Sequence, residues 1–187
     1  MGLFDETGGQ FSTDVPPPFW LFVWAGGQAL ARHVLDHPEL VRGRTVLDIA
    51  SGSGVAAIAA ALAGATEVTA LDVDPLAVAA AARNAAANGV TVGTRVSDVA
   101  DLEQSADVLL AGDVFYTGRV ADLMATRMRR AHRAGSRVLV GDPGRGFFPE
   151  RLFTRVAEYV VPVPAALEET EKLVTGVWEM RTTLRPR

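Results

Sequence analysis

The sequence of 187 residues contains no cysteine. Disulfide bonds, thiolate metal ligands and cysteine nucleophiles are therefore excluded. Lysine is almost absent, with Lys172 as its one example, and no stretch reaches the roughly 18 apolar residues that a membrane-spanning helix needs. The first residues include Asp5 and Glu6 and lack both the basic start of a secretory signal and the arginines of a transit peptide. These absences favour a cytoplasmic protein that does not act at a membrane.

The composition that remains is ordinary for a globular protein, with 49% apolar and 21% charged residues. A chain of this length fits one domain with a substantial core, so we expect a single domain over residues 1–187, with 1–15 as a flexible N-terminal tail. The formal net charge of −4 gives no general attraction to nucleic acid. The basic run at residues 127–133 could be a patch for an acidic partner, but we interpret it as a solvated helix face. The oligomeric state is left open.

Short apolar segments alternate with helical ones along most of the chain. Strands are predicted at residues 45–49, 67–71, 90–96, 107–112 and 136–141, and helices at 26–36, 55–63, 75–88 and 120–133. Asp74 is placed to cap the third of these helices and Pro75 to begin it. Strands that alternate with helices predict right-handed crossovers and a parallel sheet covered on both faces.

The last third of the chain departs from this alternation. Residues 156–161 and 173–183 are both strand-like, and the acidic, proline-containing stretch between them does not resemble a crossover helix. The final strand can therefore return antiparallel, beside the fifth. The sequence predicts a three-layer α/β, Rossmann-like fold whose seven-stranded sheet is mostly parallel with an antiparallel last strand.

A glycine loop lies between the first predicted strand and the helix that follows it. Gly52 and Gly54 allow a sharp turn and a close approach by a ligand, and the helix behind them directs free N–H groups toward that ligand. A purely structural turn can also use two glycines. Their position after a strand favours a nucleotide site.

Two kinds of nucleotide fit the loop. Gly52 to Ala57 matches the dinucleotide pattern G-x-G-x-x-A, and Asp72 follows 18 residues after Gly54, where a ribose-binding acid is expected. Asp48 argues for a different ligand, because a carboxylate before the loop disfavours a pyrophosphate and suits the ammonium group of an amino acid cofactor.

Further acids follow other predicted strands and support the second interpretation. Asp98 comes after the third strand and Asp113 after the fourth, so the carboxylates gather at the edge where open α/β sheets bind ligands. We expect Asp72 to accept from ribose hydroxyls and Asp98 from an adenine amino group. Each acid alone could simply cap a turn or a helix.

Several segments resemble one enzyme family. Residues 46–54 resemble motif I of class I, or seven-β-strand, methyltransferases, and Trp24 with residues 25–30 resembles the preceding segment of the seven-β-strand protein lysine methyltransferases. The segments 72–75, 112–116 and 141–145 look similar to those of the electron-transfer flavoprotein β-subunit lysine methyltransferases. Ala25 replaces a proline common in that group, and the residues before Pro16 do not resemble the strand-like N-terminal extension expected of it.

The resemblance implies S-adenosylmethionine (SAM) as cofactor and a protein lysine as methyl acceptor, with the electron-transfer flavoprotein as a possible protein partner. It implies cofactor contacts by Trp24, Asp48, Ser51, Gly52, Gly54, Asp72, Val73, Asp98, Val99 and Gly112. Asp113 and Tyr116 would be the catalytic pair at the acceptor end, Asp113 holding the amine and Tyr116 orienting it. Beyond the fifth strand, Arg145 could meet an acidic group of the substrate, with Asp142 fixing Arg145.

Other functions remain open from the sequence. A small-molecule N-methyltransferase needs the same cofactor site, and an NAD-dependent oxidoreductase would use the dinucleotide pattern. A metal site is not expected, because His33 and His37 lack a third ligand.

Overall fold

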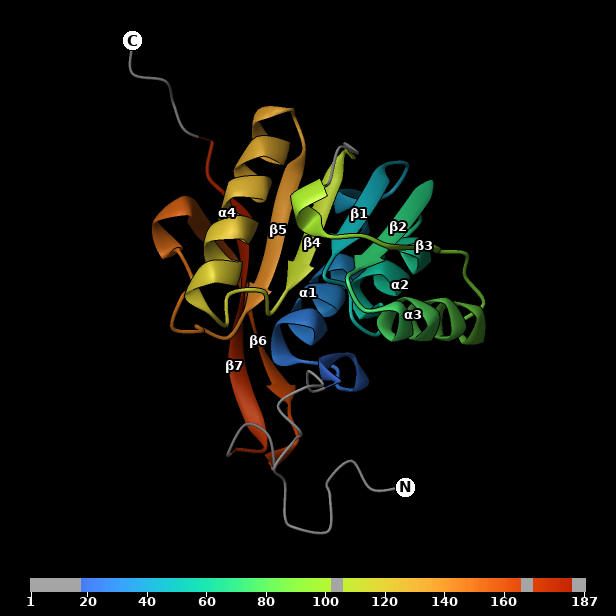
Figure 1. Cartoon of the computed structure of the whole chain (residues 1–187), viewed down its shortest axis with the longest axis horizontal. Coiled ribbons are helices and arrows are strands. Elements are labelled where there is room, and N and C mark those ends of the chain that lie inside the picture. Colours follow the sequence, from blue (N-terminus) through green and yellow to red (C-terminus); the bar gives the residue numbers. More distant parts are fainter. Residues whose placement is uncertain (1–17, 102–105, 166–169, 183–187) are drawn as a thin grey trace.

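The computed structural model describes residues 18–101, 106–165 and 170–182, so the predicted tail at 1–15 lies outside the described residues. A seven-stranded sheet runs through it in the order β3-β2-β1-β4-β5-β7-β6 (Figure 1). Strands β1 to β5 pair in parallel, and β7 lies antiparallel between β5 and β6. This confirms the predicted α/β fold, including the antiparallel last strand beside the fifth.

The strands are β1 (Thr45–Ile49), β2 (Glu67–Asp72), β3 (Gly93–Val96), β4 (Val108–Gly112), β5 (Arg137–Asp142), β6 (Phe153–Pro162) and β7 (Lys172–Met180). The α-helices are α1 (Ala25–Asp36), α2 (Val55–Leu62), α3 (Pro75–Ala87) and α4 (Gly118–Arg133). Short 3₁₀ helices are η1 (Phe19–Leu21), η2 (Pro38–Leu40), η3 (Val99–Asp101) and η4 (Glu150–Leu152).

Local hydrogen bonds explain where these bounds differ from the predicted ones. β3 begins three residues later than expected, because the N–H of Val90 donates to the carbonyl of Ala85 at 3.1 Å and so belongs to the turn after α3. α4 begins earlier, at Gly118, because Thr117 caps it by accepting from the N–H of Val120. Asp74 caps α3 as predicted, accepting from the N–H of Leu76 at 2.8 Å.

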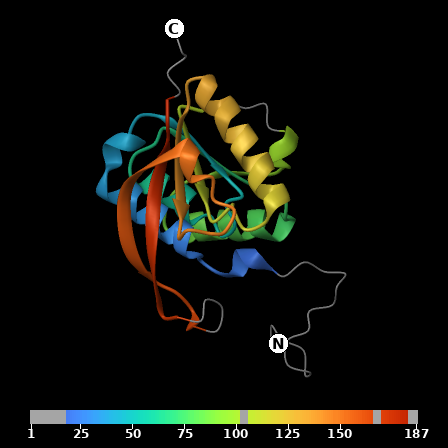
Figure 2. The same cartoon turned by 90° about the vertical axis from the view of Figure 1, so that its left-hand side faces the viewer.

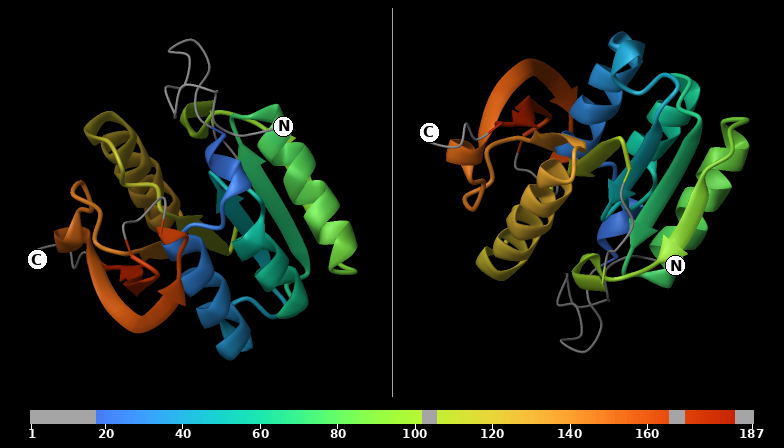
Figure 3. Two further views of the ribbon diagram at one scale, coloured as in Figure 1. Left: turned by 90° about the horizontal axis from the view of Figure 1, so that it is seen from below. Right: turned by 90° about the horizontal axis from the view of Figure 1, so that it is seen from above.

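The sheet separates two hydrophobic cores. Helices α1, α2 and α3 pack on one face and α4 on the other (Figure 3). Because side chains alternate along a strand, Val46 enters the core beneath α1 and α2, while Leu47 and Ile49 enter the core beneath α4. No helix in the described part of the chain is long and apolar enough to cross a membrane.

The connection from β5 to β6 contains only the short η4 among its regular elements. β6 and β7 then form a long curved hairpin at one side of the molecule (Figure 2). The ladder between them is irregular between Arg155 and Ala157, where a bulge interrupts the register. On the face away from α1, Val160 and Val174 pair with each other and are both exposed.

The N-terminus of α1 lies directly against the carboxyl ends of β4 and β5. A β-carbon on Gly141 would lie 1.9 Å from the carbonyl oxygen of Gly26, and one on Gly112 would lie 2.7 Å from the nitrogen of Gly27. No side chain fits at these positions unless the backbone moves. Glycines on both sides of the contact therefore bring helix and sheet together at the edge where the predicted site residues lie.

Replacement of Gly141 by alanine should destabilise the fold by about 3 kcal/mol, because overpacking of a rigid backbone contact forces a shift of α1. Gly146→Ala is the matched control, since a β-carbon there meets nothing within 4 Å. Urea unfolding of both variants measures the difference in the free energy of unfolding. Equal stability of the two variants would contradict this account of the contact.

Candidate cofactor and acceptor site

The loop after β1 adopts the left-handed conformation that its glycines permit. Gly52 has φ 53° and Gly54 has φ 84°, and a β-carbon on Gly54 would lie 2.9 Å from the β-carbon of Ala81 in α3. Ala50 also has a positive φ, 52°, which is unfavourable for any residue with a β-carbon. The backbone is thus held in a tight turn whose shape is set by the glycines and by helix packing.

Asp48 supports this turn from inside the protein. Its side chain lies beneath α2, is only 2% exposed and accepts a hydrogen bond from the N–H of Ala57 at 3.1 Å. That N–H belongs to the first turn of α2, whose free donors would otherwise face a ligand. Burial, opposed by this hydrogen bond, raises the pKa of Asp48 to about 7.

Asp72 joins the end of β2 to the glycine loop. One carboxylate oxygen accepts from the N–H of Gly52 at 2.9 Å and the other from the N–H of Asp74 at 3.0 Å. Each carboxylate oxygen can accept a second hydrogen bond. Asp72 therefore offers two oriented acceptors beside the loop, which is the arrangement that a pair of ribose hydroxyls requires.

The residues after β3 stand next to Asp72. The N–H of Ser97 donates to the carbonyl of Asp72 at 2.9 Å, and the exposed Asp98 accepts from the N–H of Ala100 at 2.7 Å, so that it begins η3. Val99 is buried in the core beneath α4, whereas Val73 is exposed. Val73 and Asp98 are therefore accessible to a ligand, whereas the side chain of Val99 packs in the core.

Two buried polar atoms lack a hydrogen-bond partner among the described residues, the Oγ of Ser51 in the loop and the Nε1 of Trp20. The backbone of Trp20 lies beside the loop, since a β-carbon on Gly52 would be 3.7 Å from its α-carbon. Buried polar groups are normally hydrogen-bonded, so this unpaired donor and hydroxyl are two groups that a polar ligand at the loop could satisfy. The residues present therefore fit an adenosyl amino acid.

Asp113 occupies a strained position after β4, with φ 54°. One of its carboxylate oxygens accepts from the N–H groups of Gly26 and Gly27, at the N-terminus of α1, and the other accepts from Arg145 at 3.1 Å. The side chain is only 8% exposed. Burial raises the pKa of Asp113, and the charge of Arg145 opposes that shift. Asp113 thus clamps α1 to the sheet.

Arg145 connects this clamp to a row of aromatic side chains. Its guanidinium lies over the ring of Trp24, 5.8 Å from the centroid, and the indole N–H of Trp24 donates to the carbonyl of Phe19 at 2.8 Å. The ring of Phe19 lies 6.1 Å from that of Tyr116. The row ends at Tyr116, which is 52% exposed; burial and the nearby charge of Asp72 raise its pKa, so the phenol stays neutral.

Asp142 lies at the end of β5, behind the clamp. One oxygen accepts from the N–H groups of Gly144 and Arg145, both at 2.7 Å, as expected for a residue that fixes Arg145. Its other oxygen is buried and has no hydrogen-bond partner among the described residues, and burial raises its pKa to about 6. Gly176 pairs with Asp142, and the indole of Trp178 packs over Gly176 with its own N–H unpaired in the described region.

The structure therefore places the predicted acids along one edge of the sheet, but they differ in exposure. All four accept from backbone N–H groups, yet Asp72 is only half-buried and Asp98 is exposed, whereas the side chains of Asp48 and Asp113 are buried. Gly112 makes room for α1. The sequence did not indicate that Arg145 pairs with Asp113 inside the same chain. The available signal was the pair of glycines at the start of α1, which mark a helix end that packs closely against another element.

A family model for ribosomal protein L11 methyltransferase (PrmA) matches residues 29–135, more than half of the chain. The chain belongs to this methyltransferase family. Among curated relatives, the electron transfer flavoprotein beta subunit lysine methyltransferase of Rattus norvegicus is 37% identical over 169 residues, or 87% of this chain. The chain spans 66% of the length of that relative.

Solved structures share the fold. The ribosomal protein L11 methylase of Lactobacillus delbrueckii subsp. bulgaricus superposes with a TM-score of 0.59 at 22% identity, covering 83% of this chain and 79% of that one. The magnesium protoporphyrin IX methyltransferase of Synechocystis, solved with bound SAM, also gives a TM-score of 0.59, at 16% identity and with 83% and 78% of the two chains covered. Both confirm the Rossmann-like arrangement of sheet and helices.

The buried carboxyl of Asp48 should make stability depend on pH. Its folded pKa of about 7 is above the ordinary value of 3.8, so the folded state binds more protons between these values and loses stability as pH rises through them. Asp48→Asn cannot ionise, and its thermal midpoint should therefore rise relative to the wild-type protein between pH 5 and pH 8.

Asp107→Asn is the control for this measurement. Hydrogen bonds from Thr45 lower the pKa of Asp107, so its ionisation is complete throughout that pH range and the variant should show no such trend. A constant difference between Asp48→Asn and the wild-type protein from pH 5 to pH 8 would show that Asp48 is not buried as a proton-binding group.

Proposed function

We propose that this chain is a SAM-dependent N-methyltransferase that modifies a lysine side chain of a protein, with the β-subunit of an electron-transfer flavoprotein as substrate. The identity of 37% to a relative that carries this name supports the choice of substrate. The choice of methyl transfer rests on one observation at the edge of the sheet: Asp72 offers two acceptors beside the glycine loop, and Tyr116 is near enough to Asp72 for its charge to raise the pKa of the phenol.

The geometry of the loop favours SAM over a dinucleotide. A pyrophosphate would bind at the free N–H groups that begin α2, but there the buried Asp48 already accepts from Ala57. In the proposed complex Asp72 holds the ribose, Asp98 and Val73 lie beside the adenine, and Ser51 and Trp20 bind the polar end. SAM supplies an activated methyl group on a sulfonium centre.

The acceptor end needs a neutral amine, because an ammonium ion has no lone pair for the methyl group. Free lysine has a pKa near ~10.4, which partial burial among aromatic rings lowers. The neutral phenol of Tyr116 can orient the amine, and the rings of Phe19 and Trp24 favour the cationic sulfonium at their faces. Asp113 is proposed to face the amine with the oxygen that it shares with Arg145, while its other oxygen holds α1.

Incubation of the purified protein with methyl-labelled SAM and candidate substrates tests the proposal. We expect label on lysine of the electron-transfer flavoprotein β-subunit, identified by mass spectrometry. Ribosomal protein L11 is the comparison substrate, because the matching family model carries its name. Label only on L11 or only on small molecules would overturn the proposed substrate. Cell fractionation tests the predicted cytoplasmic location, which is part of the proposal.

Asp72→Asn should weaken binding of S-adenosylhomocysteine about 10- to 100-fold, because the charged acceptor of the ribose hydroxyls is lost. Asp74→Asn is the matched control, since asparagine also caps helices well and Asp74 is assigned no ligand contact. Isothermal calorimetry measures both affinities, with NADH as a second titrant. Tight binding of NADH alone would defeat the methyltransferase assignment.

Tyr116→Phe should lower kcat at least tenfold while leaving the affinity for S-adenosylhomocysteine nearly unchanged, because the hydroxyl orients the acceptor and not the cofactor. Tyr159→Phe is the control, since the hydroxyl of Tyr159 lies 3.1 Å from Nδ1 of His33, away from the edge. The kcat of each variant is measured as the rate of methyl transfer to the flavoprotein subunit. Full activity of Tyr116→Phe would remove Tyr116 from the catalytic pair.

A further inference from the structure

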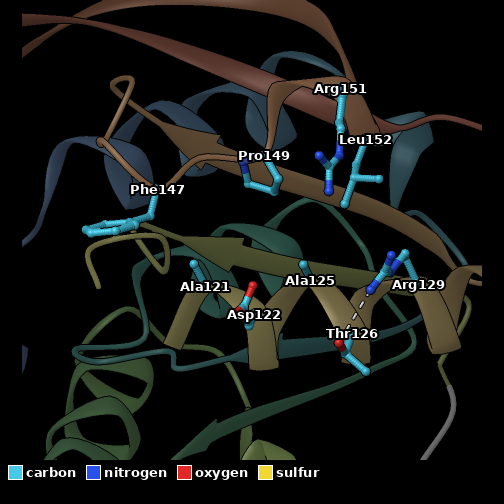
Figure 4. Close-up of a pocket in the computed structure, with 9 residues that line it drawn as sticks. All are labelled: Ala121, Asp122, Ala125, Thr126, Arg129, Phe147, Pro149, Arg151 and Leu152. Atoms are coloured by element: carbon cyan, nitrogen blue, oxygen red, sulfur yellow. Dashed lines mark hydrogen bonds between the residues drawn. The ribbon is translucent and has the colours of Figure 1, made fainter. Parts of the chain in front are cut away.

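An elongated pocket lies between α4 and the segment that connects β5 to β6. Residues of α4 form one wall and the segment 147–152 forms the other (Figure 4). Its volume is about 190 Å³, and it is lined by Ala121, Asp122, Ala125, Thr126, Arg129, Phe147, Pro149, Arg151 and Leu152. None of these residues belongs to the cofactor site described above.

One end of this pocket adjoins the proposed acceptor site. Phe147 is 53% exposed, and its ring lies 3.4 Å from the position that a β-carbon on Gly118 would take. Gly118 begins α4 two residues after Tyr116, so the Phe147 end of the pocket is the end nearer to Tyr116. A segment of a protein substrate that presents a lysine to Tyr116 can therefore continue across Phe147 into the pocket.

The other end of the pocket carries positive charge. Arg129 of α4 and Arg151 of the opposite wall line the end away from Phe147 (Figure 4). Arg129 is held by a long contact of 3.5 Å to the hydroxyl of Thr126. Asp122 lies on the α4 wall between the two ends, where its carboxylate can accept from the backbone N–H of a bound peptide. The two positive charges of Arg129 and Arg151 outnumber the one negative charge of Asp122, so the far end of the pocket favours an anionic side chain.

We propose that this pocket binds an acidic side chain of the protein substrate, in the segment next to the methylated lysine. The inference rests on the proposed function, since it assigns the specificity of the same methyl transfer. Along α4, the distance from Gly118 to Arg129 is about 16 Å at ~1.5 Å per residue. An extended peptide spans that distance in about five residues at ~3.3 Å each. The glutamate or aspartate should therefore lie about five residues from the acceptor lysine.

The double variant Arg129→Glu/Arg151→Glu tests the pocket by charge reversal. Both side chains are exposed, so the fold should be retained, and a thermal melt verifies this. With the flavoprotein β-subunit as substrate, KM should rise about tenfold or more while kcat stays close to the wild-type value, because the arginines do not touch the reacting atoms. Arg133→Glu, on an exposed position of α4 outside the pocket, is the control and should leave KM nearly unchanged.

Synthetic peptides make the test independent of the natural substrate. Each contains one lysine, with glutamate or arginine placed five residues to either side. The wild-type enzyme should prefer the glutamate peptide and the double variant the arginine peptide, a reversal that a merely structural role of the pocket does not produce. If the wild type and the double variant methylate the protein substrate with equal KM, the proposed role of the pocket is wrong, while the proposed function stands. Absence of lysine methylation on every protein and peptide would overturn the proposed function itself.

Discussion

The contact between the start of α1 and the ends of β4 and β5 is the constraint on which the site depends. Gly26 and Gly141 approach so closely that a side chain on either is excluded, and Asp113 binds the N–H groups exposed at that helix end. A carboxylate at a helix N-terminus is favoured by the helix dipole. Trp24, which immediately precedes α1, is thereby fixed near Arg145, and the aromatic row toward Tyr116 takes its position from this one contact.

Three carboxylates of this protein shape the backbone instead of facing solvent. Asp48, Asp113 and Asp142 are largely buried, and each accepts from N–H groups of a loop or of a helix end. Burial raises the pKa of all three, so their charge costs free energy that the hydrogen bonds partly offset. Such groups hold loops in one conformation before a ligand binds, which reduces the conformational entropy lost on binding.

Much of the fold followed from the sequence, because alternating strands and helices leave few topologies and the glycine loop marks the end of β1. The capping residues Asp74 and Pro75 were predictable from local chemistry alone. The sequence could also group Asp72, Asp98 and Asp113 at one edge. It could not tell which of these acids stay exposed and which are buried, since that depends on how α1 and α2 pack on the sheet. The pocket between α4 and residues 147–152 escaped prediction for the same reason: its two walls are brought together only by tertiary packing.

The hairpin of β6 and β7 has a consequence for how copies of the protein meet one another. β6 is one of the two edge strands of the sheet, and its free side presents backbone groups that could recruit a strand from a second copy. The irregularity between Arg155 and Ala157 bends this strand, and the ion pair of Arg155 with Glu158 places charge along it. Pro162 ends it with a residue that has no N–H to donate. These features disfavour strand pairing at the β6 edge, even though Val160 and Val174 remain exposed nearby.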